Sequence, residues 1–179
     1  MTMKFFIGSF FLLATLSLLS PAVFAAPLAK IMVLDFQLND MTDLPNAPEE
    51  VARVELLSAT FRQKLADGGI ELVPMAEQQK TQLSTYSATY LFDHTDVAAQ
   101  LAEGSGADYV IVAVALKPTY LFVYPRLLVV DVKTKAVVLA TYAQLESSWQ
   151  DKNTTIHTAE ILAKKVIEKF REYLNIEAK

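Results

Sequence analysis

The chain has 179 residues, of which 53% are hydrophobic and 20% are charged, with a formal net charge of -4 and no cysteine. This length and composition favour one compact domain and argue against a disordered chain. The acidic balance argues against nucleic-acid binding, which needs a basic face toward phosphate. The absence of cysteine excludes disulfides, thiolate metal sites, cysteine nucleophiles and lipid attachment through cysteine.

The start of the chain has the pattern of a secretory signal peptide. Lys4 precedes an apolar run without charge, residues 5–19, and Val23 and Ala25 are medium or small residues at the two positions that a signal peptidase reads. A short basic start, an apolar stretch of about 15 residues and a small-residue exit typify such signals. A membrane span needs about 20 apolar residues, and this run is shorter. We therefore expect a signal peptide that is cleaved after Ala25, and not a membrane anchor. The prediction is a signal peptide over residues 1–25 and one periplasmic domain over 26–179, with no membrane span and no lipid anchor.

The first half of the mature chain predicts a strand, a helix and a second strand. Residues 30–36 are mostly apolar and predict a buried strand, which a polar loop follows. Asn46 is a candidate N-cap for a helix with Pro48 in its first turn, and the Gly68-Gly69 pair ends that helix. Residues 70–73 predict the second strand.

The second half predicts two short helices, three strands and a long final helix. The expected elements are a short helix (76–83), a polar loop with Tyr86 and Tyr90, a short helix capped by Asp93 or Thr95, a central strand (109–116), two hairpin strands (120–131 and 136–145) and a long helix (148–174). Pro125 interrupts the first hairpin strand, which predicts a bulge or an edge position there. The whole order predicts an α/β (α+β) single-domain sandwich with a mixed β-sheet of about five strands flanked by helices.

The sequence shows no assembled catalytic or metal-binding set. Its two histidines, His94 and His157, lie far apart, and no His-Glu-x-x-His motif occurs. Asp93, His94 and Asp96 are close together, but such a polar stretch is more often a solvated turn than a metal site. No Gly-x-Ser-x-Gly elbow or phosphate-binding loop is present. We therefore expect a protein that is not an enzyme, with no catalytic residues, no cofactor and no metal.

Three residues are candidates for binding. Asp35 ends the first predicted strand, where open α/β sheets present ligand-contacting groups, although a structural acid that satisfies loop amides is the plainer interpretation. Glu55 lies near Arg53 on the first helix, where a surface ion pair or a solvated face is the plainer interpretation. Trp149, the single tryptophan, precedes the last helix, where it either anchors a partner or packs that helix onto the sheet.

Aromatic residues alternate in the first hairpin strand. Tyr120, Phe122 and Tyr124 are spaced by two, which predicts that they share one strand face. Covered by a helix, this face is part of the core, and left uncovered it is an interaction patch. The sequence leaves both alternatives open.

The pattern as a whole resembles a known family. Its parts are the opening KIMVLDFQLND (residues 30–40), a helix with Arg53 and Glu55, the stretch GADYVIVAVALKPTYLFVYPRLLVVDVKT (residues 106–134) and Ser148-Trp149 before a helix. In this order they resemble a family of small exported bacterial proteins of unknown function, similar in architecture to the amino-terminal domain of TolB and to the curli-secretion protein CsgG. The resemblance implies a TolB-N/CsgG-like fold, a periplasmic location and no known enzymatic activity, and it draws attention to Asp35, Glu55 and Trp149. Some relatives occur beside periplasmic quinoprotein alcohol dehydrogenase systems, which implies an accessory role.

Two functional hypotheses follow, and a third, a hydrolase, is supported by no assembled catalytic set. In the first, the domain is a non-enzymatic periplasmic module that binds another periplasmic protein through the loop from Tyr86 to Asp96, the aromatic strand or Trp149. In the second, it is an accessory protein that binds a small ligand or cofactor near Asp35, for example within a quinoprotein dehydrogenase system. An exposed aromatic patch favours the first hypothesis, and a closed pocket of roughly 300 Å³ or more favours the second.

Overall fold

The computed structural model describes residues 26–43, 47–87, 89–145 and 148–177. Its elements are β1 (Ala29–Val33), β2 (Gln37–Asp40), α1 (Pro48–Asp67), β3 (Ile70–Val73), α2 (Glu77–Leu83), α3 (Tyr90–Asp93), α4 (Thr95–Ala102), β4 (Tyr109–Lys117), β5 (Tyr124–Asp131), β6 (Val137–Tyr142) and α5 (Lys152–Glu177). The predicted signal peptide, residues 1–25, lies outside the described part of the chain. No helix in the described part is long and apolar enough to cross a membrane.

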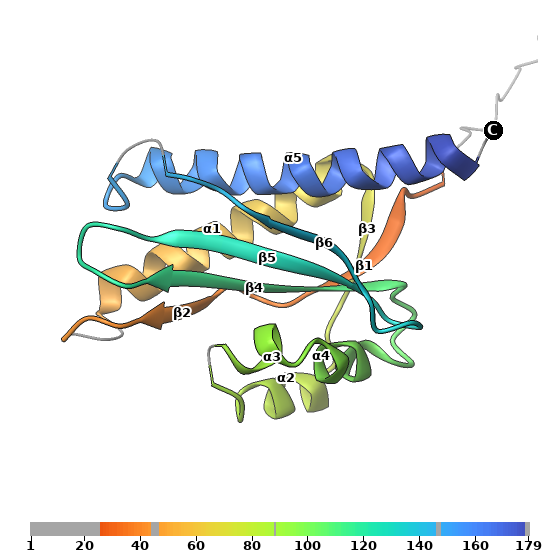
Figure 1. Ribbon diagram of the computed structural model, residues 1–179, viewed down its shortest axis with the longest axis horizontal. Helices are drawn as coiled ribbons and strands as arrows, with labels where there is room; N and C mark the ends of the chain where they lie inside the picture. Colours follow the sequence, from red (N-terminus) through yellow and green to blue (C-terminus); the bar gives the residue numbers. More distant parts are fainter. Residues whose placement is uncertain (1–25, 44–46, 88, 146–147, 178–179) are drawn as a thin grey trace, which may run out of the picture.

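A single mixed sheet runs through the molecule, with helices on both faces (Figure 1). Its strand order is β3-β1-β4-β5-β6, and β2 pairs with β4 in addition. The pairs of β1 with β3 and of β1 and β2 with β4 are parallel, whereas β4, β5 and β6 pair antiparallel. The expected mixed α/β fold is therefore confirmed, with six strands in the described part of the chain where about five were expected.

The additional strand is β2, in a stretch where a polar loop was expected. It pairs in parallel with the second half of β4, while β1 pairs with the first half. Residues 34–36 separate β1 from β2, and Asp35 lies in the middle of this junction. Polar residues such as Asn39 and Asp40 disfavour a strand by local preference, so pairing with β4 decides the conformation here.

Helix α1 begins within one residue of its predicted start and ends where the sequence predicts. Pro48 occupies the start of the helix, where the backbone N–H that it lacks would have no partner, and two acids in the first turn suit the helix dipole. After the helix, Gly69 has a φ of 92°, a left-handed conformation that glycine adopts at low cost. The predicted cap, Asn46, lies outside the described residues, and Ala47 stands at the N-cap position without a side-chain hydrogen bond.

Several expected boundaries in the second half are wrong. Tyr90, expected in a loop, begins the short helix α3. Strand β5 begins only at Tyr124, so Tyr120 and Phe122 lie in the β4–β5 loop and not on a strand. Helix α5 begins at Lys152, so Trp149 belongs to the segment that precedes the helix. Apolar loop residues mimic strand periodicity, and this explains why the first hairpin strand was expected to be longer.

Pro125 produces neither the expected bulge nor an edge position. It is the second residue of β5, which lies between β4 and β6, and the irregularity in pairing falls between Val129 and Val130. Proline is tolerated near the beginning of a strand, where a missing N–H interrupts the ladder least.

Two apolar cores fill the two faces of the sheet. Helices α1 and α5 cover one face, with Phe61 and Phe170 among the buried residues that pack on β4 and β5. The second core is smaller, and there Leu91 and Leu101 from α3 and α4 pack on the opposite face of β4. Helices α2, α3 and α4 lie under the half of the sheet that is remote from the β4–β5 loop (Figure 1).

We expect Gly68→Ala to destabilise the protein, because α1 ends close against α5. A Cβ atom at position 68 would overlap Cδ1 of Ile167, and the shift that relieves this overlap costs about 1–3 kcal/mol of unfolding free energy. Ile167→Val, which removes Cδ1, costs about 0.5–1.5 kcal/mol alone and should cost less beside Gly68→Ala. Urea denaturation of the four proteins measures this coupling, and strictly additive costs would contradict it.

Candidate functional site

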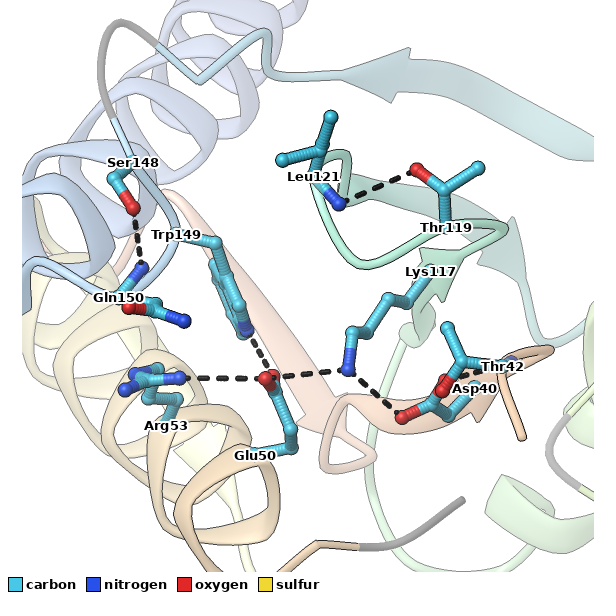
Figure 2. A network of polar contacts seen from close by, with 10 residues as sticks. All are labelled: Asp40, Thr42, Glu50, Arg53, Lys117, Thr119, Leu121, Ser148, Trp149 and Gln150. Atoms are coloured by element: carbon cyan, nitrogen blue, oxygen red, sulfur yellow. Dashed lines mark hydrogen bonds and ion pairs between the residues drawn. The ribbon is translucent and has the colours of Figure 1, made fainter. Parts of the chain in front are cut away.

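A buried lysine at the end of β4 joins the sheet to α1. The side chain of Lys117 is 4% exposed, and its Nζ lies 3.0 Å from Oδ2 of Asp40 and 3.2 Å from Oε1 of Glu50. Asp40 ends β2 and is more buried than the lysine, and Glu50 lies in the first turn of α1 and is slightly less buried. The ammonium group therefore connects β4, β2 and α1 at one end of the sheet (Figure 2).

Glu50 extends this network to the segment before α5. The indole Nε1 of Trp149 donates a hydrogen bond to Oε2 of Glu50 (Figure 2). Nη1 of Arg53 lies 3.4 Å from Oε1 of the same carboxylate. We call Asp40, Glu50, Arg53, Lys117 and Trp149 the Lys117 cluster. Its two acids and two bases balance, and buried charges are tolerated only when they are paired and hydrogen-bonded in this way.

Lys117 and Asp40 are both held in their charged forms. Burial alone would lower the pKa of Lys117, but the hydrogen bonds and charges of Asp40 and Glu50 outweigh it and raise that pKa above the usual 10.5. Burial would raise the pKa of Asp40, but hydrogen bonds from Thr42 and Lys117 outweigh it and lower the pKa below 3.8. The Thr42 hydroxyl and backbone N–H lie 2.7 and 3.0 Å from Oδ1 of Asp40. These two groups are thus a structural ion pair near neutral pH.

Next to the cluster, the protein exposes a group of large apolar side chains. We call it the aromatic surface, and its members are Tyr120 (58% exposed), Leu121 (79%), Phe122 (54%), Tyr124 (44%) and Tyr142 (61%). Four of them belong to the β4–β5 loop or the first residue of β5, and the fifth ends β6. The alternative that the sequence left open is therefore decided in favour of exposure for Tyr120, Phe122 and Tyr124.

The aromatic surface contains ordered contacts and a groove. The rings of Phe122 and Tyr124 stack at 6.4 Å with an interplanar angle of 18°. Tyr142 lies on β6 opposite Arg126 of β5, so Tyr142 and Tyr124 share a sheet face by the strand alternation. A groove of about 600 Å³ is lined by Leu121, Phe122, Val123, Tyr124, Tyr142, Gln144, Leu145 and Ser148. It ends beside the segment that carries Trp149.

The Lys117 cluster supports the base of this surface. The β4–β5 loop begins directly after Lys117, and the Tyr120 ring centre lies 5.7 Å from Nζ of Lys117. The backbone N–H of Leu121 donates to Oγ1 of Thr119 at 3.3 Å within the loop (Figure 2). At the other end of the loop, Val123 is buried in the larger core. The exposed rings therefore project from a loop that is held at both ends.

The other sequence candidates lie in two different places. Asp35 and Glu55 line the same cavity of about 380 Å³, together with Arg62, which forms an ion pair with Asp35. Arg53 pairs with Glu50 and not with Glu55. Trp149 is 4% exposed and packs in the core, so it presents no free ring to a partner in this structure.

Of the Lys117 cluster, Trp149 and Arg53 were noted in the sequence, whereas Asp40, Glu50 and Lys117 were not expected to form a site. Lys117 and Asp40 are separated by 77 residues, and Trp149 and Glu50 by 99. One signal was available, because Lys117 directly follows an apolar run that was expected to be a central strand, and a lysine there needs an acidic partner.

Asp93, His94 and Asp96 do not assemble into a metal-binding group. Across the described ranges, no set of three His, Cys, Asp or Glu side chains is placed to hold a metal ion. The His94 ring instead lies against Tyr90, with ring centres 4.3 Å apart.

Comparisons with known proteins concern most of the chain. The family model DUF3280, described as a protein of unknown function (DUF2380), matches residues 29–164. No curated protein sequence matches. Similar solved structures include the LpoB C-terminal domain from Salmonella enterica, with 20% identity and a TM-score of 0.46 over 69% of this chain and 86% of that one. Lipoprotein GNA1162 from Neisseria meningitidis has 16% identity and a TM-score of 0.49 over 80% of this chain and 96% of that one. The PelC dodecamer from Paraburkholderia phytofirmans has 15% identity and a TM-score of 0.44 over 82% of this chain and 89% of that one.

The expectation of a family of unknown function is thereby confirmed. The expected likeness to TolB and CsgG stays a prediction. At these identities and TM-scores, the solved structures describe a distant likeness in architecture and nothing more.

We expect Lys117→Met to destabilise the protein strongly. The substitution leaves the carboxylates of Asp40 and Glu50 buried beside each other without their shared cation, which costs about 3–5 kcal/mol of unfolding free energy. Lys164→Met is the matched control, because Lys164 is exposed and pairs only at the surface with Glu168, so its loss costs at most about 1 kcal/mol. Urea denaturation measures both, and equal small losses would contradict the structural role of the cluster.

The same cluster predicts a pH dependence. The lowered pKa of Asp40 contributes stability that is present above about pH 4 and disappears as pH falls through that lowered pKa. The raised pKa of Lys117 contributes stability below about pH 10.5 that disappears as pH rises through the raised value. The stability difference between the native chain and Asp40→Asn should therefore be largest between these limits and shrink at acidic pH. A difference that stays constant on acidification would contradict this assignment.

Proposed function

We propose, for a chain that belongs to the DUF3280 family of proteins of unknown function, a non-enzymatic accessory role in which the domain binds a partner protein. The binding site is the aromatic surface, and the partner is another exported protein in the periplasm. The predicted signal peptide supports this location. The sequence and the described residues offer a surface for recognition, and the proposal rests on that surface.

One observation carries the proposal: large apolar side chains are exposed together at one end of the sheet. Aromatic residues are enriched among the residues that contribute most to binding energy in protein interfaces. Exposed apolar patches on soluble domains commonly mark such sites. Tyr120, Phe122, Tyr124 and Tyr142 combine apolar area with three phenolic hydroxyls, so the surface can bury carbon and still satisfy polar groups of a partner.

The way in which the rings are held strengthens the proposal. The β4–β5 loop begins at the buried Lys117 and returns to the core at Val123, and the Phe122 and Tyr124 rings stack on each other. A surface that is ordered before binding loses less conformational entropy when a partner arrives. The adjoining groove of about 600 Å³ offers space for a side chain of the partner.

Photo-crosslinking in cells tests this proposal directly. A photoreactive phenylalanine analogue at position 122 should form an adduct with one defined exported protein. The same analogue at Val137, which is 44% exposed at the other end of β6, should not form that adduct. The same adducts at both positions, or no protein adduct at position 122, would argue against binding through this surface.

Substitution of the exposed rings should then weaken the interaction with the crosslinked protein. We expect Phe122→Ala and Tyr142→Ala each to raise the dissociation constant by about tenfold, because both rings are exposed and line the groove. Their effect on stability should stay within about 0.5 kcal/mol, since neither ring is part of the core. Titration calorimetry and urea denaturation separate the two effects, with Val137→Ala as the control.

A further inference from the structure

One edge of strand β2 is open with respect to the described strands. Its only partner strand in the described chain is β4. The N–H of Met41 donates to the C=O of Lys117 at 3.0 Å, and backbone groups alternate in direction along a strand. The N–H and C=O groups of Leu38 and Asp40 therefore point away from β4. Repeated unpaired groups of this kind form a template for an additional strand.

Space for such a strand lies along this edge. Two cavities, of about 380 and 590 Å³, meet at Asp35 and Arg62, which line both. The first lies between β2 and α1 and includes the apolar Val51 and Val54. The second lies where β3 ends, beside Pro74. Strand β3 pairs with β1, on the same side of the sheet on which the edge of β2 is open. The position next to β2 therefore lies in line with β3, and no described strand fills it.

The charges along the edge select the kind of occupant. Asp35 is paired with Arg62, whereas Glu55 is an exposed acid on α1 in the same cavity. The second cavity adds Lys80, whose Nζ lies 2.6 Å from Oε1 of Glu77. The first cavity, between β2 and α1, carries one more acid than base, which favours a basic side chain there. The same surplus disfavours the corresponding edge of a second copy, since like charges would face each other.

We propose that the open edge of β2 binds an extended, lysine- or arginine-containing segment of another protein as an additional strand of the sheet. This site is separate from the aromatic surface and does not depend on its partner. The unpaired groups repeat along a line and do not converge on one point, which favours an extended chain over a small molecule. Backbone pairing supplies affinity, and contact of the basic residue with Glu55 supplies selectivity.

Synthetic peptides test the proposal on the full chain. The probe is a capped peptide of alternating valine and lysine, about seven residues long, which spans β2 and the junction at about 3.3 Å per residue. Two matched peptides serve as controls, one with glutamate in place of lysine and one with N-methyl groups on alternate amides in either register. We expect the lysine peptide to bind, the glutamate peptide to bind at least about fivefold more weakly, and the N-methylated peptides not to bind.

Variants of the protein locate the binding. Glu55→Gln should weaken the lysine peptide by about fivefold, whereas Glu172→Gln, an exposed acid on α5, should leave it unchanged. Leu38→Pro removes an outward N–H and leaves the ladder to β4 intact, so it should abolish binding. If Leu38→Pro does not fold, the N-methylated peptides test the same hydrogen bonds on the native chain.

Amide hydrogen exchange supplies the direct readout. In the free protein, the N–H groups of Leu38 and Asp40 should exchange faster than that of Asn39, which faces β4. The lysine peptide should slow the first two by about tenfold or more and leave Asn39 unchanged. Equal binding of the N-methylated peptides, or no added protection, would overturn the proposal. Protection already present in the free chain would also overturn it, and its loss on dilution would identify a second copy as the occupant.

Discussion

The buried ammonium group of Lys117 is the constraint on which this end of the molecule depends. An unpaired charge in an apolar interior costs several kcal/mol, so a lysine at the end of a buried central strand requires carboxylates beside it. Asp40 and Glu50 provide them, from β2 and from the first turn of α1. The polar strand β2 is thereby held against β4, and α1 is oriented with its first turn toward the sheet. Glu50 also accepts the indole hydrogen bond of Trp149, which places the segment before α5.

Both proposed interaction surfaces adjoin this cluster. The β4–β5 loop follows Lys117 directly, so the Lys117 cluster fixes the start of the loop that carries most of the aromatic surface. On the other side, β2 is bound through Asp40 to Lys117, and its outer edge stays unpaired within the described chain. A polar network in the interior thus determines which apolar rings and which backbone groups face outward. The same end of the domain offers two chemically different means of recognition, by aromatic burial and by strand pairing.

Most of the fold could be predicted because its elements have local signals. The helical spacing of Val54, Leu57 and Phe61 and the glycines after α1 identified that helix, and the apolar run of β4 identified the central strand. Strand β2 could not be predicted, since its polar residues become a strand only by pairing with β4. The exposure of Phe122 was also undecided, because it depends on where β5 begins and on which part of the sheet α2, α3 and α4 cover (Figure 1). Local periodicity carries no information about either arrangement.

The sequence by itself determined the class of fold, the order of its main elements, the acidic charge and the absence of cysteine chemistry. These properties follow from composition and from hydrophobic spacing within short segments. Only the tertiary structure decided that Lys117 meets Asp40 and Glu50, that Trp149 is buried, and that the aromatic rings are exposed. The physical reason is distance along the chain. The contacting residues are separated by 77 positions in one pair and by 99 in the other, and such contacts arise from the packing of whole elements and leave no periodic pattern in the sequence.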